Sequence, residues 1–234
     1  MSYCKLSVNI NKFALVRNSR GYMPDLSQIV RDIERYGADG ITVHPRPDER
    51  HITKRDVYEL KNVISKEYNI EGYPTEDFIR MVEDVQPTQC TLVPDGPQQL
   101  TSDHGWDTID KASMLNDIVS RLHASNIRVS LFIDPDQSLI EAAHDTGADR
   151  LELYTGPYAA DTALLGLYAT AAKWIADIGM GLNAGHDLNL SNLKNFYVSC
   201  PNLLEVSIGH ALVNDAWHYG LENTVAMYRR LLVG

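Results

Sequence analysis

The sequence predicts an α/β fold: a closed (β/α)8 barrel with a few extra helices and a polar interior, formed as a single domain over residues 1–234. Eight short apolar runs are each followed by a segment with helical spacing, and the connections between them are short. Neither a G-x-G-x-x-G nor a Walker sequence occurs, which weighs against an open nucleotide-binding sheet. Eight such units in a chain of this length favour the barrel.

The expected strands are β-branched or alternating runs. Proline ends two of them, at Pro74 and Pro94, because proline cannot donate a hydrogen bond within a central sheet. A Gly-Ala-Asp tripeptide precedes two others, at residues 37–39 and 147–149, where a helix stops and a strand starts. The strands are expected at residues 5–10, 41–44, 69–73, 89–93, 128–133, 151–154, 181–184 and 204–208.

Helical spacing marks the segments between these strands. Residues 25–36 illustrate it, with Leu26, Val30 and Ile33 on one face. The other helices are expected at residues 54–66, 75–84, 109–125, 136–146, 160–178, 189–197 and 215–232, and loops at 17–24 and 95–108.

Composition limits the possible partners and compartments. The net charge of −10 argues against binding to nucleic acid or to anionic membranes, both of which need a basic surface. The apolar segment 159–178 contains Asp161, Lys173 and Asp177, so we expect a buried helix there and no membrane span. Three widely spaced cysteines and the lack of a visible signal peptide indicate a reducing, cytoplasmic location.

The predicted strands alternate between apolar and polar residues, which is unusual for parallel strands buried on both faces. Because the apolar set must meet the helices, the polar set must point into the barrel. This places Glu71, Glu152 and Glu205 inside, where a carboxylate is costly unless it is paired, protonated or hydrated. We expect a polar, hydrated interior into which the ligand pocket reaches. The alternative is that these residues form structural ion pairs, above all Glu205, which no motif supports.

The stretch 40–51 is the strongest candidate for a site. It begins as a buried strand and ends in a loop that carries His44, Arg46, Arg50 and His51. Titratable groups just past the carboxyl end of a strand are typical of an active site in a barrel. The alternative is an exposed, charge-rich loop.

Two later strand ends carry glycine followed by histidine, Gly185-His186 and Gly209-His210. Glycines let backbone amides reach an anion, and the loops after strands seven and eight form a recurrent phosphate site in such barrels. The alternative is that both glycines only make tight turns. Arginines from the other side, Arg20, Arg46 and Arg50, could hold a second phosphate.

No metal or cofactor site is predicted. The histidines lack an H-E-x-x-H or His-x-His spacing, and a set of His44, His51 and His186 with a glutamate would be non-specific. A lysine that forms an imine inside the barrel is also unsupported, since strand six offers Glu152, and Lys12 is the only lysine near the expected mouth.

An ordered set of motifs resembles the pyridoxine 5′-phosphate synthase family (PdxJ). The set is Val8-Asn9-Ile10, Arg17-Asn18 with Arg20-Gly21, the run from Gly37 to His44, Arg50-His51-Ile52-Thr53, Asn183-Ala184-Gly185-His186 and Ile208-Gly209-His210-Ala211. The resemblance implies a barrel whose dimers assemble into a homo-octamer, without metal or organic cofactor. It implies condensation of 1-deoxy-D-xylulose 5-phosphate with 3-amino-2-oxopropyl phosphate to pyridoxine 5′-phosphate, phosphate and water, in vitamin B6 biosynthesis.

The resemblance also implies roles for individual residues. His44 and Glu71 match the general bases, and His186 matches the proton donor. Matches to the substrate contacts are Arg46, His51 and Thr101 for the deoxyxylulose phosphate, and Asn9, Arg20, Gly209 and His210 for the aminoketone phosphate. Glu152 and Arg50 are expected to support these groups.

Two positions depart from the family pattern. Asn11-Lys12 stands where many members have Asp-His, which removes a carboxylate and replaces a titratable ring with a fixed cation. Asp187 follows His186 where some members have glycine. All three residues remain candidate substrate contacts.

Two rival functions fit parts of the same pattern. A sugar-phosphate isomerase or epimerase on the same barrel would use His44 and Glu71 on one substrate and would need one phosphate site. A catalytically silent barrel would bind a phosphorylated ligand without turnover.

The polar loop 95–108, which contains Thr101, is a candidate lid that would keep water from reactive imines. Alternatively, it is an ordinary mobile surface loop.

Overall fold

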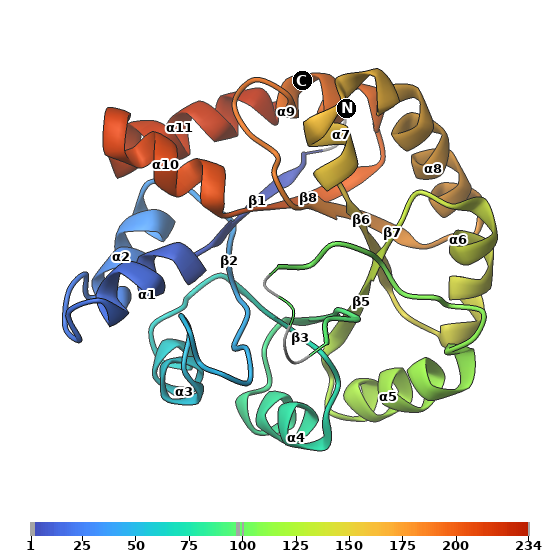
Figure 1. Ribbon diagram of the computed structural model, residues 1–234, viewed down its shortest axis with the longest axis horizontal. Helices are drawn as coiled ribbons and strands as arrows, with labels where there is room; N and C mark the ends of the chain where they lie inside the picture. Colours follow the sequence, from blue (N-terminus) through green and yellow to red (C-terminus); the bar gives the residue numbers. More distant parts are fainter. Residues whose placement is uncertain (1–2, 97–98, 100, 234) are drawn as a thin grey trace.

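The computed structural model describes residues 3–96, 99 and 101–233, and part of the candidate lid, residues 97, 98 and 100, lies outside the described residues. Eight parallel strands close into a barrel in sequence order, with β1 paired to β8. Figure 1 shows the helices as a ring around this barrel. The strands are β1 (Lys5–Asn9), β2 (Gly40–Val43), β3 (Glu67–Gly72), β4 (Gln89–Leu92), β5 (Arg128–Ile133), β6 (Arg150–Tyr154), β7 (Gly181–Gly185) and β8 (Leu203–Ile208). The predicted (β/α)8 fold is confirmed.

The helices that cover the strands match the predicted order. Several begin at a side-chain cap: Asp25, Thr53, Thr75 and Asp136 each accept backbone hydrogen bonds from the first turn. The helices are α1 (Asn11–Asn18), α2 (Leu26–Arg35), α3 (Lys54–Lys61), α4 (Glu76–Val85), α5 (Ala112–Ala124), α6 (Gln137–Ala143), α7 (Gly156–Ala160), α8 (Leu165–Asp177), α9 (Leu193–Ser199), α10 (His210–Tyr219) and α11 (Leu221–Leu231), with short 3-10 turns η1 (His144–Thr146) and η2 (Thr162–Leu164).

Two long helices were predicted wrongly, because local breaks outweigh their apolar character. The expected helix 160–178 begins later, as α8 at Leu165, because the extended backbone of Asp161 and its side-chain bond to the amide of Ala163 separate α7 from η2 and α8. The expected final helix 215–232 is two helices. They meet at Gly220, whose φ of 75° does not fit a helix.

Helix α1 was not predicted, and its last residues fall in the expected loop 17–24. It buries Ala14 but leaves Leu15 and Val16 exposed, so the sequence shows no apolar stripe there. Other boundaries also moved, most of all two: α3 ends at Lys61 where residue 66 was expected, and α9 begins at Leu193 where residue 189 was expected.

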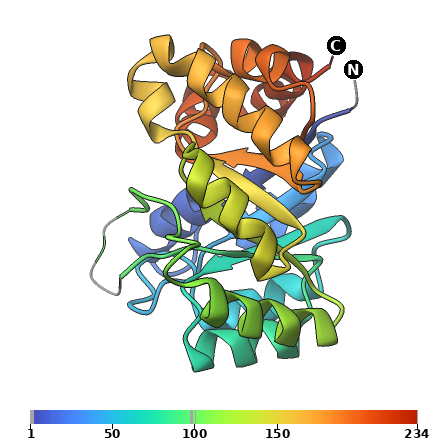
Figure 2. The ribbon, with the colours of Figure 1, turned by 90° about the vertical axis from the view of Figure 1, so that its right-hand side faces the viewer.

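The barrel interior is polar, as predicted. Hydroxyl and amide side chains from successive strands bond to one another across it: Ser7 to Thr42 at 2.7 Å, Asn69 to Thr42 at 3.3 Å and Thr91 to Asn69 at 3.1 Å. The apolar residues of the same strands are buried in the layer between strands and helices. Figure 2 shows the connection after β4 at one end of the barrel and both termini at the other.

Candidate active site

A cavity of about 320 Å³ opens at the carboxyl end of the barrel. Every strand, or the connection directly after it, contributes to its wall. The lining residues are Asn9, Asn11, Lys12, His44, Arg46, His51, Glu71, Val93, Thr101, Ser102, Phe132, Glu152, His186, Asp187, Ser207, Gly209 and His210. The catalytic and substrate-contact candidates named from the sequence therefore lie around one cavity, with the exception of Arg20; the supporting candidate Arg50, together with Gly185 and Glu205, is also absent from its lining.

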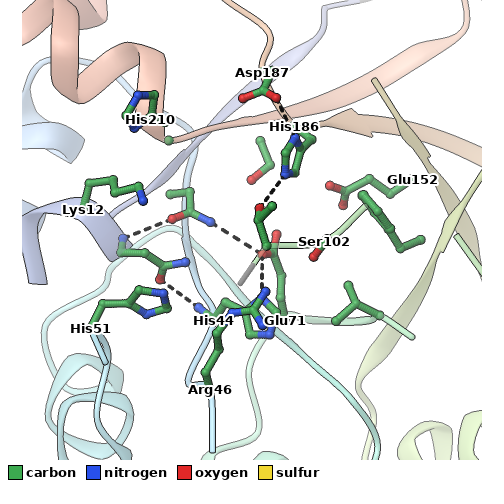
Figure 3. Close-up of a pocket in the computed structure, with 17 residues that line it drawn as sticks. Lys12, His44, Arg46, His51, Glu71, Ser102, Glu152, His186, Asp187 and His210 are labelled. Atoms are coloured by element: carbon green, nitrogen blue, oxygen red, sulfur yellow. Dashed lines mark hydrogen bonds and ion pairs between the residues drawn. The ribbon is translucent and has the colours of Figure 1, made fainter. Parts of the chain in front are cut away.

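His44 and Glu71 lie together in the wall of this cavity; His44 is buried, and the Glu71 side chain is 12% exposed. His44 Nδ1 lies 3.8 Å from Glu71 Oε2, and the amide of Asn9 donates to the same oxygen at 3.5 Å (Figure 3). The backbone amide of His44 donates to Asn11 Oδ1 at 2.9 Å, which fixes the turn that ends β2. Side chains from β1, β2 and β3 thus meet at one carboxylate.

Burial shifts both groups toward their neutral forms. It lowers the pKa of His44 well below the ordinary value, and the positive charges of Arg46, His51 and Arg50 add to the effect. Burial also raises the pKa of Glu71 well above its ordinary value, assisted by the charge of Glu152. A neutral imidazole with a free lone pair beside a carboxyl group of raised basicity suits proton abstraction near neutral pH.

The other two interior glutamates have different surroundings. Glu152 lines the cavity, and burial, followed by the charge of Glu205, raises its pKa to about 8. Glu205 lies deeper and does not line the cavity. Its Oε2 is 3.2 Å from Arg150 and 3.9 Å from Arg128, and burial raises its pKa to about 7. The structural alternative applies to Glu205, whereas Glu152 faces the site.

His186 approaches from the opposite wall (Figure 3). Its Nδ1 lies 3.0 Å from Asp187 Oδ2 and its Nε2 lies 2.9 Å from the Thr101 hydroxyl. The edge of the Tyr154 ring packs against the imidazole, with the centroids 5.1 Å apart. The ring is therefore held on three sides at the mouth of the cavity.

One side of the mouth is formed by a helix start close to a lysine. Gly209 joins β8 to α10, a ten-residue helix that begins directly after the strand. His210 also lines this side, and Lys12 lies between His210 and His51 (Figure 3). Backbone amides at a helix start and the nearby Lys12 ammonium favour an anion such as phosphate.

The other side is built around Arg46 and His51. The Arg46 guanidinium is buried and ion-paired to Asp95 Oδ2 at 2.6 Å, and it donates to the Gln99 carbonyl at 2.7 Å. Burial lowers the pKa of His51 to about 4, with Arg46 and Lys12 adding to the shift, so its ring is neutral. Thr101 and Ser102 complete this wall from the connection after β4.

Arg20 and Arg50 do not line the cavity. Arg20 is exposed in the turn after α1. The Arg50 guanidinium pairs with Asp48 at 2.6 Å. In this structure neither guanidinium is placed to contact a ligand in the cavity.

Several residues of the site were missed from the sequence. Asp95 anchors Arg46 and accepts from the Ser102 hydroxyl at 2.7 Å, and Val93 and Phe132 supply apolar wall. An acid directly after the proline that ends β4 was an available signal for Asp95. Ser102 and Phe132 have no comparable signal, since serine in a loop and phenylalanine in a strand are common.

Within residues 3–96, 99 and 101–233, no three or more histidine, cysteine, aspartate or glutamate side chains are grouped to hold a metal ion. Over the same ranges, no helix combines the length and apolar character needed to cross a bilayer.

Comparison with known families gives one clear match. The model described as "Pyridoxal phosphate biosynthesis protein PdxJ" matches residues 6–234. A protein of Cytophaga hutchinsonii named pyridoxine 5′-phosphate synthase is 51% identical over 234 residues, covering 97% of this chain and 98% of that protein. A protein of Porphyromonas gingivalis with the same name is 52% identical over 231 residues, covering 96% and 97%.

Solved structures with little sequence identity share the fold. Tryptophan synthase from M. tuberculosis superposes with a TM-score of 0.68 at 10% identity, covering 99% of this chain and 94% of that one. Phosphoribosylanthranilate isomerase from Thermotoga maritima gives 0.62 at 13% identity, covering 98% of both chains. These similarities concern the barrel alone.

Proposed function

The chain belongs to the PdxJ family of pyridoxal phosphate biosynthesis proteins, and from that premise we propose that it is an enzyme that closes the pyridoxine ring. Its substrates are 1-deoxy-D-xylulose 5-phosphate and 3-amino-2-oxopropyl phosphate. Its products are pyridoxine 5′-phosphate, inorganic phosphate and water. The observation that carries the proposal is a single cavity that combines His44, Glu71 and His186 with two groups of anion-binding residues.

The reaction needs several proton transfers. An amine condenses with a ketone, water and phosphate leave, and the ring becomes aromatic. We assign proton removal to His44 and Glu71, whose shifted pKa values keep one ring neutral and one carboxyl group unusually basic. His186, on the facing wall, gives a proton to a leaving oxygen. The polar interior near Glu152 accommodates the water that is released.

The two phosphates are assigned to opposite sides of the mouth. Arg46, His51 and Thr101 contact the deoxyxylulose phosphate, with Asn11 and Lys12 beside them. The aminoketone phosphate lies at the start of α10, near Asn9, Gly209 and His210. Arg20 stays a proposed contact that would have to move from its exposed position, or to belong to another subunit, to reach the ligand.

Assembly and location are part of the proposal. The chain forms a homo-octamer, a tetramer of dimers, in the cytoplasm. Exposed aromatic residues support association: Trp217 on α10 is 71% exposed and Tyr22, after α1, is 74% exposed, and α10 lies beside α1 (Figure 1). Three buried cysteines, Cys4, Cys90 and Cys200, form no disulfide, which suits a reducing compartment.

The test separates condensation from isomerisation. Purified protein is incubated with the deoxyxylulose phosphate alone and the sugar is followed by NMR. Under the proposal the sugar is not isomerised or epimerised, and inorganic phosphate appears only after the aminoketone phosphate is added. Conversion of the sugar alone would favour an isomerase, and binding without any phosphate release would favour a silent barrel.

A further inference from the structure

Two consecutive residues at the cavity mouth have left-handed backbone conformations although neither is glycine. His186 has a φ of 85° and Asp187 a φ of 60°. Such conformations are unfavourable for residues other than glycine and persist where the surroundings enforce them. Contacts around His186 and Asp187 must therefore stabilise this backbone conformation.

Buried hydrogen bonds hold this segment in place. The hydroxyl of Thr155, which is fully buried, lies 2.7 Å from the carbonyl oxygen of Gly185 and 2.6 Å from that of His186. The amide of Asn192, also buried, donates to the Asp187 carbonyl at 3.3 Å. The connection after β7 is thus fixed from two sides, and its conformation turns the Asp187 carboxylate onto the imidazole of its neighbour.

The contacts of the His186 ring determine which nitrogen carries hydrogen. The Asp187 carboxylate has a lowered pKa, first through its hydrogen bond with His186 and then through the charges of His186, His210 and Lys12. As an ionised group it can only accept a hydrogen bond, so Nδ1 of His186 must be the donor across the 3.0 Å contact. Nε2 then carries no hydrogen in the neutral ring and accepts the hydrogen bond of the Thr101 hydroxyl. A substrate group that takes the place of this hydroxyl would meet the same nitrogen.

A carboxylate at the rim of an anion-binding cavity also needs explanation. Asp187 lines the same cavity as Lys12 and His210, where its charge would repel a phosphate. A direct contact between its side chain and the substrate phosphate would therefore weaken binding. Holding the His186 ring in one orientation is a benefit of the Asp187 carboxylate that offsets its repulsion of the phosphate.

We propose that Asp187 is a positioning residue that fixes His186 in the Nδ1–H tautomer, so that Nε2 is the ring atom that exchanges protons with the substrate. This inference rests on the proposed function, in which His186 is the proton donor. In that step the Nε2–H bond of the imidazolium breaks, and the proton forms a new O–H bond with the leaving oxygen. The Nδ1–H stays on the ring, Asp187 stays ionised, and the neutral ring regains a proton from solvent.

The experiment records ¹⁵N NMR spectra of histidine-labelled full-length protein at a pH where His186 is neutral, without substrate. The variants are Asp187→Gly and Asp187→Asn, both of which suit a φ of 60°. We expect the wild-type protein and Asp187→Asn, which keeps an acceptor oxygen, to show the Nδ1–H tautomer. Asp187→Gly should lose it. The matched control is Asp145→Asn, because Asp145 is also paired with a preceding histidine, His144, at 3.5 Å but is outside the cavity.

The same variants are then assayed. Because general acid catalysis contributes about 10²–10⁴-fold, we expect Asp187→Gly to lower kcat roughly 10-fold with little change in KM for either phosphate. An unchanged tautomer in Asp187→Gly, or a change in KM alone, overturns the proposal. The tautomer is read in the resting protein, so absence of turnover in the wild type would refute the proposed function and leave this test intact.

Discussion

His44 Nδ1 lies 3.8 Å from Glu71 Oε2, although His44 directly follows β2 and Glu71 belongs to β3. The imidazole is pushed toward its neutral form and the carboxyl group toward its protonated form, both chiefly by burial. The neutral imidazole can accept a proton, and the carboxylate form of Glu71 binds a proton more strongly than an ordinary carboxylate, which is the basis for assigning both as bases.

Removing the carboxylate should abolish most catalysis and leave the fold intact. Glu71→Gln keeps the shape of the side chain and eliminates its basicity, so we expect ring closure to slow by about 10²–10³-fold. Steady-state release of phosphate measures the rate, and circular dichroism checks the fold. Glu83→Gln alters a carboxylate paired with Arg121 outside the cavity and should keep full activity. Wild-type turnover in Glu71→Gln would remove Glu71 from the mechanism.

Lys12 should contribute more to one substrate than to the other. Its charge lowers the pKa of His51, a proposed contact of the deoxyxylulose phosphate, so the two side chains lie within electrostatic reach. We expect Lys12→Ala to raise KM for this sugar about 10-fold, equivalent to about 1.4 kcal/mol, and to affect the aminoketone phosphate less. Lys194→Ala, a lysine outside the cavity, is the control. Equal changes in both KM values would show that Lys12 is not a specific sugar-phosphate contact.

Glu152 should make the folded protein less stable as the pH rises. Its pKa is about 8 in the folded state, against an ordinary value of 4.5, so between these values the folded protein keeps a proton that the unfolded chain has lost. Stability therefore falls as pH increases through this window. Glu152→Gln removes the effect, and we expect it to raise the free energy of unfolding at pH 8.5 by roughly 1–3 kcal/mol.

Urea unfolding at pH 5.5 and pH 8.5 measures this difference. Glu205, with a pKa of about 7, also lowers the stability of the folded protein as the pH rises. The free energy of unfolding of Glu152→Gln should therefore still fall with pH, but less steeply than that of the wild type. If the wild type and Glu152→Gln lose the same stability between the two pH values, Glu152 is not protonated in the folded protein.

Asp56 should be important for stability and for the position of His51. It ion-pairs with Arg17 and completes a capping box with Thr53 at the start of α3, while Arg17 also donates to the His51 carbonyl at 3.3 Å. We expect Asp56→Ala to cost about 2–4 kcal/mol, because it leaves a half-buried guanidinium unpaired and removes a cap.

Thermal and urea unfolding measure that cost. The matched control is Glu59→Ala on the same helix, since its pair with Arg55 is exposed and contributes little to stability. Similar losses of stability in the two variants would mean that the ion pair of Arg17 with Asp56 stabilises the fold no more than an exposed pair does.

Much of the fold could be predicted because the barrel strands carry a strong local signal. Alternation of residues such as Thr42 and Val43 distinguishes the two faces of each strand, and prolines or glycines mark the ends. The breaks at Asp161 and Gly220 could not be predicted with the same certainty. Helical spacing continues across both positions, and a single backbone conformation decides the outcome.

The candidate site was predictable where residues directly follow a strand. His44 and His186 are in this class, since the barrel brings all strand ends to one mouth. The partner of Arg46 was not predictable, because Asp95 is distant in sequence and reaches it only through the path of a connection. The exposed position of Arg20 was not predictable either, because it depends on where α1 ends. That helix lacks an apolar stripe, so the sequence gives no signal for its end.

The central claim is that residues from separate strands act on two phosphorylated substrates in one cavity. Mass-spectrometric detection of pyridoxine 5′-phosphate, together with a count of released phosphate, tests it most directly. The account predicts one molecule of pyridoxine 5′-phosphate for each phosphate released, and neither product when one substrate is omitted. Saturation of the purified protein with both substrates without formation of the ring would contradict it.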